Sequence, residues 1–369
     1  MSRIPAAAAA SAVAVAIIAI AVVVVVAAAP APTAGGGGAV QPDQRVLRLG
    51  YFPVVGHAIP IVGVEQGIFS RYLPDVRIES RVFDSGPQVV EAMFAGSIDV
   101  AYVGPGPAIN AFLNSGESDT IRVLSGAASG GTSFVMHPDS ASPEFDFAHK
   151  RIAAPQIGNT QDVSLRHYME QRGLQASDRG GNVVVYNIPN PDIVTLFVKG
   201  EIDGAWVSEP WATILVEEYG GVRLFYEEEM WPGGKFATVL LIAGESYVQE
   251  NRDIVDGWLG AHEEAAKVIN SDRDAAGVMF NDFLLDHFGQ QLDPGVVREA
   301  VHNTEVTVDP LSGTVYEFAE RADRLGYMGR GSYDLSDLFF SFDGADYDEG
   351  PGLDGGSGDG DGDGDRGTG

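Results

Sequence analysis

The sequence contains two similar stretches, "GSIDVAYVGPGP" at residues 96–107 and "GEIDGAWVSEPW" at residues 200–211. Five of the eight residues at 96–103 are identical to those at 200–207, and Tyr102 aligns with Trp206, an aromatic with an aromatic. In both copies a helical pattern ends at the first glycine, and a short apolar strand and a loop follow. The repeat therefore indicates two domains that share the same helix–glycine–strand–loop junction.

The residues around each stretch alternate between strand and helix patterns in the same order. The first copy predicts strands at 46–52, 76–83 and 99–103, and helices at 87–95 and 107–113, the latter with Pro107 at its first position. The second copy predicts strands at 151–156, 182–188 and 204–207, a helix that ends at Gly173, and helices at 191–199 and from Pro210. This alternation is typical of α/β units with a mainly parallel sheet.

After the second copy the chain returns to the first domain. A buried strand is predicted at 236–243, after the Pro-Gly-Gly turn at 232–234, and helices follow to about residue 330. We therefore expect lobe I to contain residues 46–130 and 236–330, and lobe II residues 131–235. Two chain crossings, at 125–136 and 232–238, would form a two-strand hinge around a cleft that closes on a ligand.

Both ends of the sequence differ from this middle part. Residues 6–29 are an unbroken apolar run, long enough to cross a bilayer, so residues 1–29 are predicted to be a signal peptide or an uncleaved membrane anchor. Residues 30–45 form a flexible linker rich in Pro, Ala and Gly, and residues 343–369 an acidic Gly/Asp tail that is expected to be disordered. The main body is therefore expected outside the cytoplasm, secreted or anchored to the outer face of the membrane.

Composition and missing motifs exclude several function classes. The net charge of −29 repels nucleic acid and anionic lipid, so neither is expected as a partner, and the membrane is reached only through the N-terminal segment. The chain has no cysteine, which excludes disulfides, thiolate zinc sites, a cysteine nucleophile and a lipidated N-terminal cysteine. No G-x-x-x-x-G-K-[ST] motif is present, which disfavours a nucleotide triphosphatase.

Four loops are candidates for a ligand site, because ligands of parallel α/β sheets lie beyond the carboxyl ends of the strands. They are residues 53–58, 104–107, 157–162 and 208–211, and none contains Lys or Arg. Free N–H groups at the helix starts that follow could hold a small oxyanion without a salt bridge. The candidate ligand-binding residues are His57, Gly104, Pro105, Gly106, Gly158, Asn159, Thr160, Gln161, Asp162, Glu209 and Trp211.

Glu209 is an unexpected residue beside an anion. Its carboxylate could meet a ligand amine, bind a cation, or cap the helix that starts at Pro210, and these alternatives stay open at the sequence level. His57 is a lone histidine in its loop, with no nucleophile or partner acid at a catalytic spacing. No catalytic residue, cofactor or metal is therefore predicted.

Several of these segments together resemble a known family. "LRLGYFP" (47–53), "GSIDVAYVGPGPAI" (96–109), "GAASGG" (126–131), "RIAAPQIGNTQDVSLR" (151–166) and "GEIDGAWVSEPWA" (200–212) are similar to the solute-binding proteins of ABC importers for nitrate, aliphatic sulfonates, taurine and bicarbonate. The resemblance implies a type II periplasmic-binding-protein fold of two α/β lobes, with the loops at 104–107, 159–162 and 209–211 lining the cleft. It implies a monomer without catalytic activity that delivers a small anion or zwitterion to a permease driven by a separate ATPase.

The lack of a basic residue in the four loops favours a sulfonate as the solute, including an amino-sulfonate such as taurine, whose amine Glu209 would meet. Nitrate and bicarbonate remain alternatives. Two other readings are a binding protein for a thiamine-pyrimidine precursor and a related pyrimidine-forming enzyme, although such enzymes rely on a cysteine-rich motif that this chain lacks. A binding protein that serves a signalling partner is a further alternative.

Overall fold

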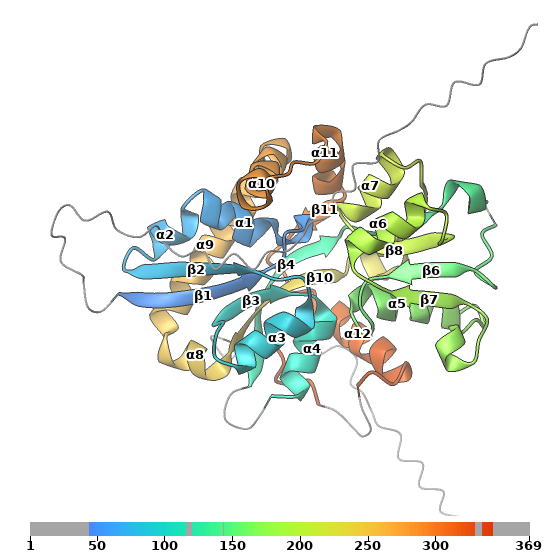
Figure 1. Cartoon of the computed structure of the whole chain (residues 1–369). Coiled ribbons are helices and arrows are strands. Elements are labelled where there is room, and N and C mark those ends of the chain that lie inside the picture. The colour runs from blue at the N-terminus through green and yellow to red at the C-terminus, as the bar shows by residue number, and fades with distance from the viewer. Residues whose placement is uncertain (1–43, 116–119, 143, 329–333, 342–369) are drawn as a thin grey trace, which may run out of the picture.

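The computed structural model describes residues 44–115, 120–142, 144–328 and 334–341. Two β-sheets lie side by side, each covered by helices on both faces (Figure 1). The predicted signal or anchor segment at 1–29, the linker up to residue 43 and the acidic tail at 343–369 lie outside the described residues. Within the described ranges, no helix is both long and apolar enough to span a membrane.

The two sheets have matching strand orders. The first sheet has the order β11-β4-β10-β3-β1-β2, and its strands are β1 (Arg45–Tyr51), β2 (Val76–Val82), β3 (Val100–Val103), β4 (Ile121–Gly130), β10 (Ala237–Gly244) and β11 (Thr304–Val306). The second has the order β7-β6-β8-β5-β9, and its strands are β5 (Thr132–Met136), β6 (Arg151–Ala154), β7 (Val184–Asn187), β8 (Gly204–Ser208) and β9 (Val222–Tyr226). The series β2-β1-β3-β10-β4 thus corresponds strand by strand to β7-β6-β8-β5-β9.

The prediction of a mainly parallel sheet is confirmed for strand direction, because β1, β2, β3 and β4 run the same way in the first sheet, as do β6, β7, β8 and β9 in the second. Among the described strands, β1–β2 and β1–β3 in the first sheet, and β6–β7 and β6–β8 in the second, are direct parallel neighbours. Strand β10 runs antiparallel to both β3 and β4, and β5 runs antiparallel to both β8 and β9. The physical reason is that β5 and β10 enter their sheets from the other lobe, without the crossover helix that parallel neighbours need.

Helices of the first lobe form two layers. One layer contains α1 (Ala58–Glu65), α2 (Ile68–Tyr72), α9 (Arg252–Ser271) and α10 (Arg273–Phe288), and its core includes Leu47 and Leu49 of β1 and the stacked rings of Phe69 and Trp258, 3.8 Å apart. The other contains α3 (Gly86–Phe94), α4 (Pro105–Leu113) and α12 (Ser312–Arg324). Burial of each such large apolar side chain contributes about 1.5–3 kcal/mol.

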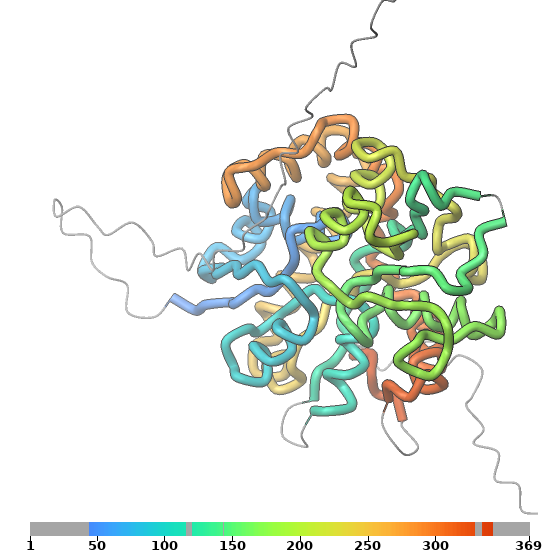
Figure 2. The backbone as a smooth tube through the Cα atoms, turned by 45° about the vertical axis from the view of Figure 1, so that its right-hand side comes forward, coloured from blue at the N-terminus to red at the C-terminus, as the bar shows by residue number. Residues whose placement is uncertain are grey.

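The second lobe has α5 (Thr160–Glu170) on one face of its sheet and α6 (Asn190–Val198) and α7 (Trp211–Glu217) on the other (Figure 1). Helix α11 (Pro294–His302) lies beside α7 and brings the two lobes together on that side (Figure 2). The remaining helices are α8 (Glu245–Glu250) and five short 3₁₀ segments, η1 (Val55–His57), η2 (Pro138–Ser140), η3 (Ser177–Arg179), η4 (Glu227–Met230) and η5 (Pro232–Gly234).

The repeated Gly-x-Ile-Asp segment has a structural role in both lobes. The Asp99 carboxylate accepts hydrogen bonds from the backbone N–H and from Nε of Arg48 on β1, at 2.8 and 2.9 Å. The Asp203 carboxylate accepts the same pair from Arg151 on β6, at 2.9 and 3.1 Å. Each aspartate therefore fixes the strand that follows it to its parallel neighbour, β3 to β1 and β8 to β6.

Helix α4 begins two residues before its predicted start at Pro107. Pro105, rather than Pro107, is the first residue of the helix, and Gly104 is the N-cap. A helix tolerates both prolines there, because the N–H groups of its first turn have no partner within the helix. The start at Pro105 places Gly104 at the edge between the two lobes.

Candidate functional site

A single cavity of about 790 Å³ lies where the loops of both sheets meet. Its wall is formed by residues from segments 52–57, 83–88, 104–107, 155–161, 187–192 and 208–211, together with residues of the two crossings between the sheets. Most of these segments follow the carboxyl ends of parallel strands, where α/β proteins bind ligands. The volume falls within the range of about 300–1,000 Å³ that is usual for small-molecule sites.

The structure brings most of the predicted site residues to this cavity. Its wall includes His57, Gly104, Asn159, Thr160, Gln161, Glu209 and Trp211. It does not include Pro105, Gly106, Gly158 or Asp162. Gly106 is enclosed between the Gly158 carbonyl oxygen and the Phe318 ring, and Asp162 is fully buried beneath the loop. Ligand contact by any of the eleven residues stays a prediction.

Two segments of the cavity wall were not among the loops predicted from the sequence. Residues 83–88 follow β2, and residues 187–192 follow β7, the edge strands of the parallel part of each sheet. The same rule about carboxyl ends of strands would have selected them, but their sequences do not repeat between the lobes. They contribute Asp84 and Asp192 to the wall.

The starts of four helices line the cavity, those of α3 and α4 from the first lobe and of α5 and α6 from the second. Each start has a partial positive charge, and its non-proline residues carry backbone N–H groups without a partner in the helix. Pro87, Pro105, Pro107 and Pro191 in the first turns of α3, α4 and α6 have no N–H. At α5, the Asn159 side chain accepts from the Asp162 N–H at 3.0 Å and serves as the N-cap. Together the four helix starts direct partial positive charges toward a cavity whose described wall contains no Lys or Arg.

His57 is a neutral histidine on the wall. Its side chain is 2% exposed, and burial lowers its pKa to about 3. Nδ1 accepts a hydrogen bond from the Phe52 N–H at 3.2 Å, so the proton of the neutral ring is on Nε2. No described residue accepts from Nε2, which leaves this N–H as a donor for a ligand.

Three other polar atoms of the wall residues are buried without a hydrogen-bond partner among the described residues. They are Trp211 Nε1, Thr238 Oγ1 and Asn190 Oδ1. A buried polar group without a partner costs about 1–3 kcal/mol, so proteins rarely leave several on one surface. Their placement around one cavity makes them candidate hydrogen-bond partners for a ligand.

Glu209 is engaged within the protein. Its carboxylate is 1% exposed and accepts from the Thr213 N–H at 3.0 Å, which caps α7. It also pairs with Arg223 at 3.2 Å and accepts from Asn303 Nδ2 at 3.0 Å. Of the roles predicted for Glu209, the structure therefore shows helix capping, supplemented by an internal ion pair.

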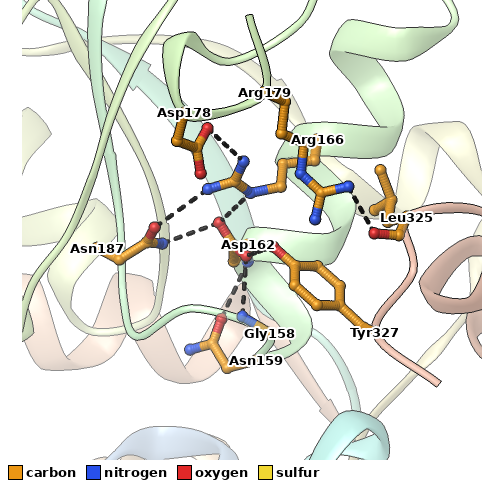
Figure 3. A network of polar contacts seen from close by, with 9 residues as sticks. All are labelled: Gly158, Asn159, Asp162, Arg166, Asp178, Arg179, Asn187, Leu325 and Tyr327. Carbon is orange, nitrogen blue, oxygen red and sulfur yellow. Dashed lines mark hydrogen bonds and ion pairs between the residues drawn. The ribbon is translucent and has the colours of Figure 1, made fainter. Parts of the chain in front are cut away.

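Asp162 holds the Gly158–Asn159 loop in place through its carboxylate (Figure 3). One carboxylate oxygen accepts from the Gly158 N–H at 2.9 Å and from the Tyr327 hydroxyl at 2.7 Å. The other accepts from Arg166 Nε and Asn187 Nδ2, both at 2.8 Å. Burial, and then the Asp162 charge, raise the pKa of Tyr327 to about 12, so its hydroxyl stays protonated as a donor.

The two lobes touch along one side of the cavity. A Cβ atom added to Gly104 of the first lobe would lie 2.7 Å from Thr160 Oγ1 of the second. Such a separation is shorter than real contacts allow, so glycine at 104 permits this approach. The arrangement is a cleft between two lobes whose walls meet at the starts of α4 and α5.

A two-lobed α/β fold with a polar cleft between its lobes defines the class of periplasmic binding proteins. Residues 40–280 match the model of the NMT1-like family, and the chain belongs to this family. The alkanesulfonate-binding protein SsuA from Xanthomonas axonopodis pv. citri, solved bound to MOPS, has a similar fold, with a TM-score of 0.62 and 20% identity over 76% of this chain and 92% of that one. The resemblance inferred from the sequence and the predicted type II fold are both confirmed.

Two curated relatives have higher sequence identity over shorter aligned segments. A putative binding protein of Brucella abortus (strain 2308) is 28% identical over 225 residues, which cover 60% of this chain and 66% of the relative. The taurine-binding periplasmic protein of Escherichia coli (strain K12) is 27% identical over 183 residues, 49% of this chain and 54% of that protein. The chain thus spans just under two thirds of the first relative and about half of the second.

Proposed function

We propose that this protein is the extracytoplasmic solute-binding component of an ABC importer, and that its cleft captures a small organic sulfonate, taurine-like solutes included, for delivery to a permease. The family and the relatives that bind taurine and alkanesulfonates support this class of solute. The single observation that carries the proposal is the convergence of four helix starts on one cavity whose described wall contains no Lys or Arg.

A sulfonate suits such a wall. Its charge is spread over three oxygens, each of which can accept hydrogen bonds from helix N–H groups. The Nε2–H of His57, the Nε1–H of Trp211 and the Thr238 hydroxyl add side-chain donors. Because His57 is neutral, these donors supply hydrogen bonds and dipoles without a full positive charge.

The proposal is tested by thermal unfolding of the full chain, in a mild detergent, against a panel of solutes. The panel contains ethanesulfonate, taurine, nitrate, bicarbonate and a pyrimidine. A ligand that binds only the folded state stabilises it by about 2.7 kcal/mol at a hundredfold excess over Kd. We expect the sulfonates to raise the midpoint and the other solutes to leave it unchanged.

Two results would contradict the assignment. A shift with nitrate or bicarbonate alone would reassign the cleft to an inorganic anion, and a shift with the pyrimidine alone would favour a thiamine-precursor binder. Delivery to a permease is tested separately, by pull-down of the membrane subunits with the solute-loaded chain.

A further inference from the structure

Two carboxylates of the cleft have no partner among the described residues. Asp84 precedes α3 in the first lobe, and Asp192 lies in the first turn of α6 in the second. Both are wall residues of the same cavity and both are exposed. No described donor reaches either carboxylate, whereas the third acid of the wall, Glu209, is bonded to Arg223, Thr213 and Asn303.

An acid near a helix start has an ordinary explanation, because it stabilises the positive end of the helix by about 0.3–1 kcal/mol. This explains why acids occur near α3 and α6, but not why both carboxylates face a cavity that lacks Lys and Arg among its described wall residues. Asp84 is exposed as a residue, but partial burial of its carboxyl group raises its pKa, so this carboxylate has lost part of its hydration. Further burial of two unpaired carboxylates during lobe closure would cost more, unless a cation entered with the solute.

The buried part of the cavity wall presents hydrogen-bond donors, whereas the exposed part presents carboxylates. This contrast indicates a solute with two chemically different ends. His57 is 2% exposed and Trp211 is 8% exposed, and each presents an N–H without an acceptor among the described residues. These buried donors suit the acceptor end of a solute, whereas the exposed carboxylates suit a donor that carries positive charge. The two kinds of group occupy one cavity of about 790 Å³, which has room for a molecule larger than a simple inorganic anion.

We propose that the solute carries a cationic group, an ammonium or a similar nitrogen cation, which Asp84 and Asp192 hold from opposite lobes, while its oxyanion lies against the donors of the buried wall. This inference rests on the proposed function and specifies its solute as a zwitterion. It moves the amine contact from Glu209, whose carboxylate is already occupied, to the two free carboxylates. A metal ion is a poorer occupant, because the described residues contain no group of three or more His, Asp or Glu suited to a metal.

The experiment compares solutes that differ only in the amine. Isothermal titration calorimetry on the full chain, in a mild detergent, measures Kd for ethanesulfonate against taurine and for propanesulfonate against homotaurine. We expect the amino member of each pair to bind at least tenfold more tightly. In the double variant Asp84→Asn/Asp192→Asn, we expect this ratio to fall below threefold.

A matched control removes the same charge elsewhere. Asp75 in the first lobe and Glu201 in the second are exposed acids outside the cavity wall. The variant Asp75→Asn/Glu201→Gln should keep the wild-type ratio, which separates a local contact from the effect of net charge. An equal loss of the ratio in both double variants would overturn the proposal.

The two proposals fail in different ways. Equal affinity of the wild-type chain for both members of each pair overturns the zwitterion inference and leaves the sulfonate assignment intact. Absence of binding for all four sulfonates overturns the assignment itself. The wild-type comparison needs no substitution, so the inference stays falsifiable even if the double variant does not fold.

Discussion

Two buried histidines of this protein have different roles, because one is bonded within the protein and the other faces the cavity. His262 and His57 are both buried neutral histidines, but only His57 belongs to the cavity wall. His262 accepts from the Tyr102 hydroxyl through Nδ1 at 2.8 Å and donates to the Gly126 carbonyl oxygen through Nε2 at 2.9 Å. Both of its ring nitrogens are therefore used, whereas His57 keeps one nitrogen for a ligand.

The buried His262 predicts how stability depends on pH. Burial lowers its pKa to about 4, whereas an unfolded histidine titrates near 6.5, so the unfolded state binds the proton more readily. Its contribution to stability is complete above pH 6.5 and is lost as the pH falls toward 4, by about 1.4 kcal/mol per pH unit. We expect the urea-unfolding free energy of His262→Gln to fall less steeply than that of the wild type between pH 6.5 and 4.5.

The exposed His149 gives the matched control, and His149→Asn should keep the wild-type slope. The difference in slope between His262→Gln and the wild type isolates this residue from the other buried titrating groups. An identical slope in His262→Gln would show that His262 binds its proton as readily in the folded state as in the unfolded state.

At the scale of elements, α5 is the helix that connects the cleft to the interior. Asp162 joins the cavity loop at Gly158, Arg166 within α5, and Tyr327 after α12 (Figure 3). Helix α12 packs on α4 of the first lobe, so the Tyr327–Asp162 bond links the lobes. The sequence motif "GNTQD" thus positions the cleft loop through its aspartate.

Replacement of Asp162 should therefore lower the free energy of unfolding more than removal of the Tyr327 hydroxyl. Asp162→Asn leaves Arg166, which is 3% exposed, with only the half-exposed Asp178 as a carboxylate partner, and loss of one member of a buried ion pair costs about 3–5 kcal/mol. Tyr327→Phe keeps that ion pair and removes one hydrogen bond to a charged group, about 1.5–3 kcal/mol. Urea unfolding of both variants measures the difference, and equal losses would contradict the assigned role of the ion pair.

The sequence was sufficient to predict the strands and helices that repeat in the two lobes, but not how all the strands pair in the two sheets. The period of the apolar residues and the glycine after each helix predicted the strands and helices of both copies closely. The strand at 236–243 was predicted in the first domain, but the antiparallel direction of β5 and β10 was not predictable, because an apolar run does not specify the direction of a strand. Asp84 and Asp192 were missed because their loops do not repeat, and the partners of Glu209, Arg223 and Asn303, lie 14 and 94 residues away in the sequence.

At the scale of the whole molecule, the lobes approach closely enough for glycine to be required. In Gly104→Ala the new Cβ would overlap Thr160 Oγ1, and such overpacking costs about 1–3 kcal/mol. If closure binds the solute, the affinity for a bound sulfonate should fall about tenfold, and the solute-induced decrease in radius of gyration should shrink. Calorimetry and small-angle scattering measure the two effects.

A second substitution provides the control for this steric argument. Thr160→Ala removes the Oγ1 atom that the added Cβ would meet, so Gly104→Ala/Thr160→Ala should recover closure relative to Gly104→Ala alone. Failure of the double variant to recover compaction would place the effect in the backbone of α4 instead of the contact between lobes.

The exchange of strands between the sheets also determines the order in which the chain can assemble as it leaves the ribosome or the export channel. In the first sheet β10 lies between β3 and β4, but β10 begins at residue 237, more than one hundred residues after β4 ends at residue 130. The second sheet uses only the continuous stretch from Thr132 to Tyr226. The second sheet can therefore be completed first, although its chain emerges later. Until Gly244 emerges, the facing edges of β3 and β4, between which β10 inserts, are open to wrong partners.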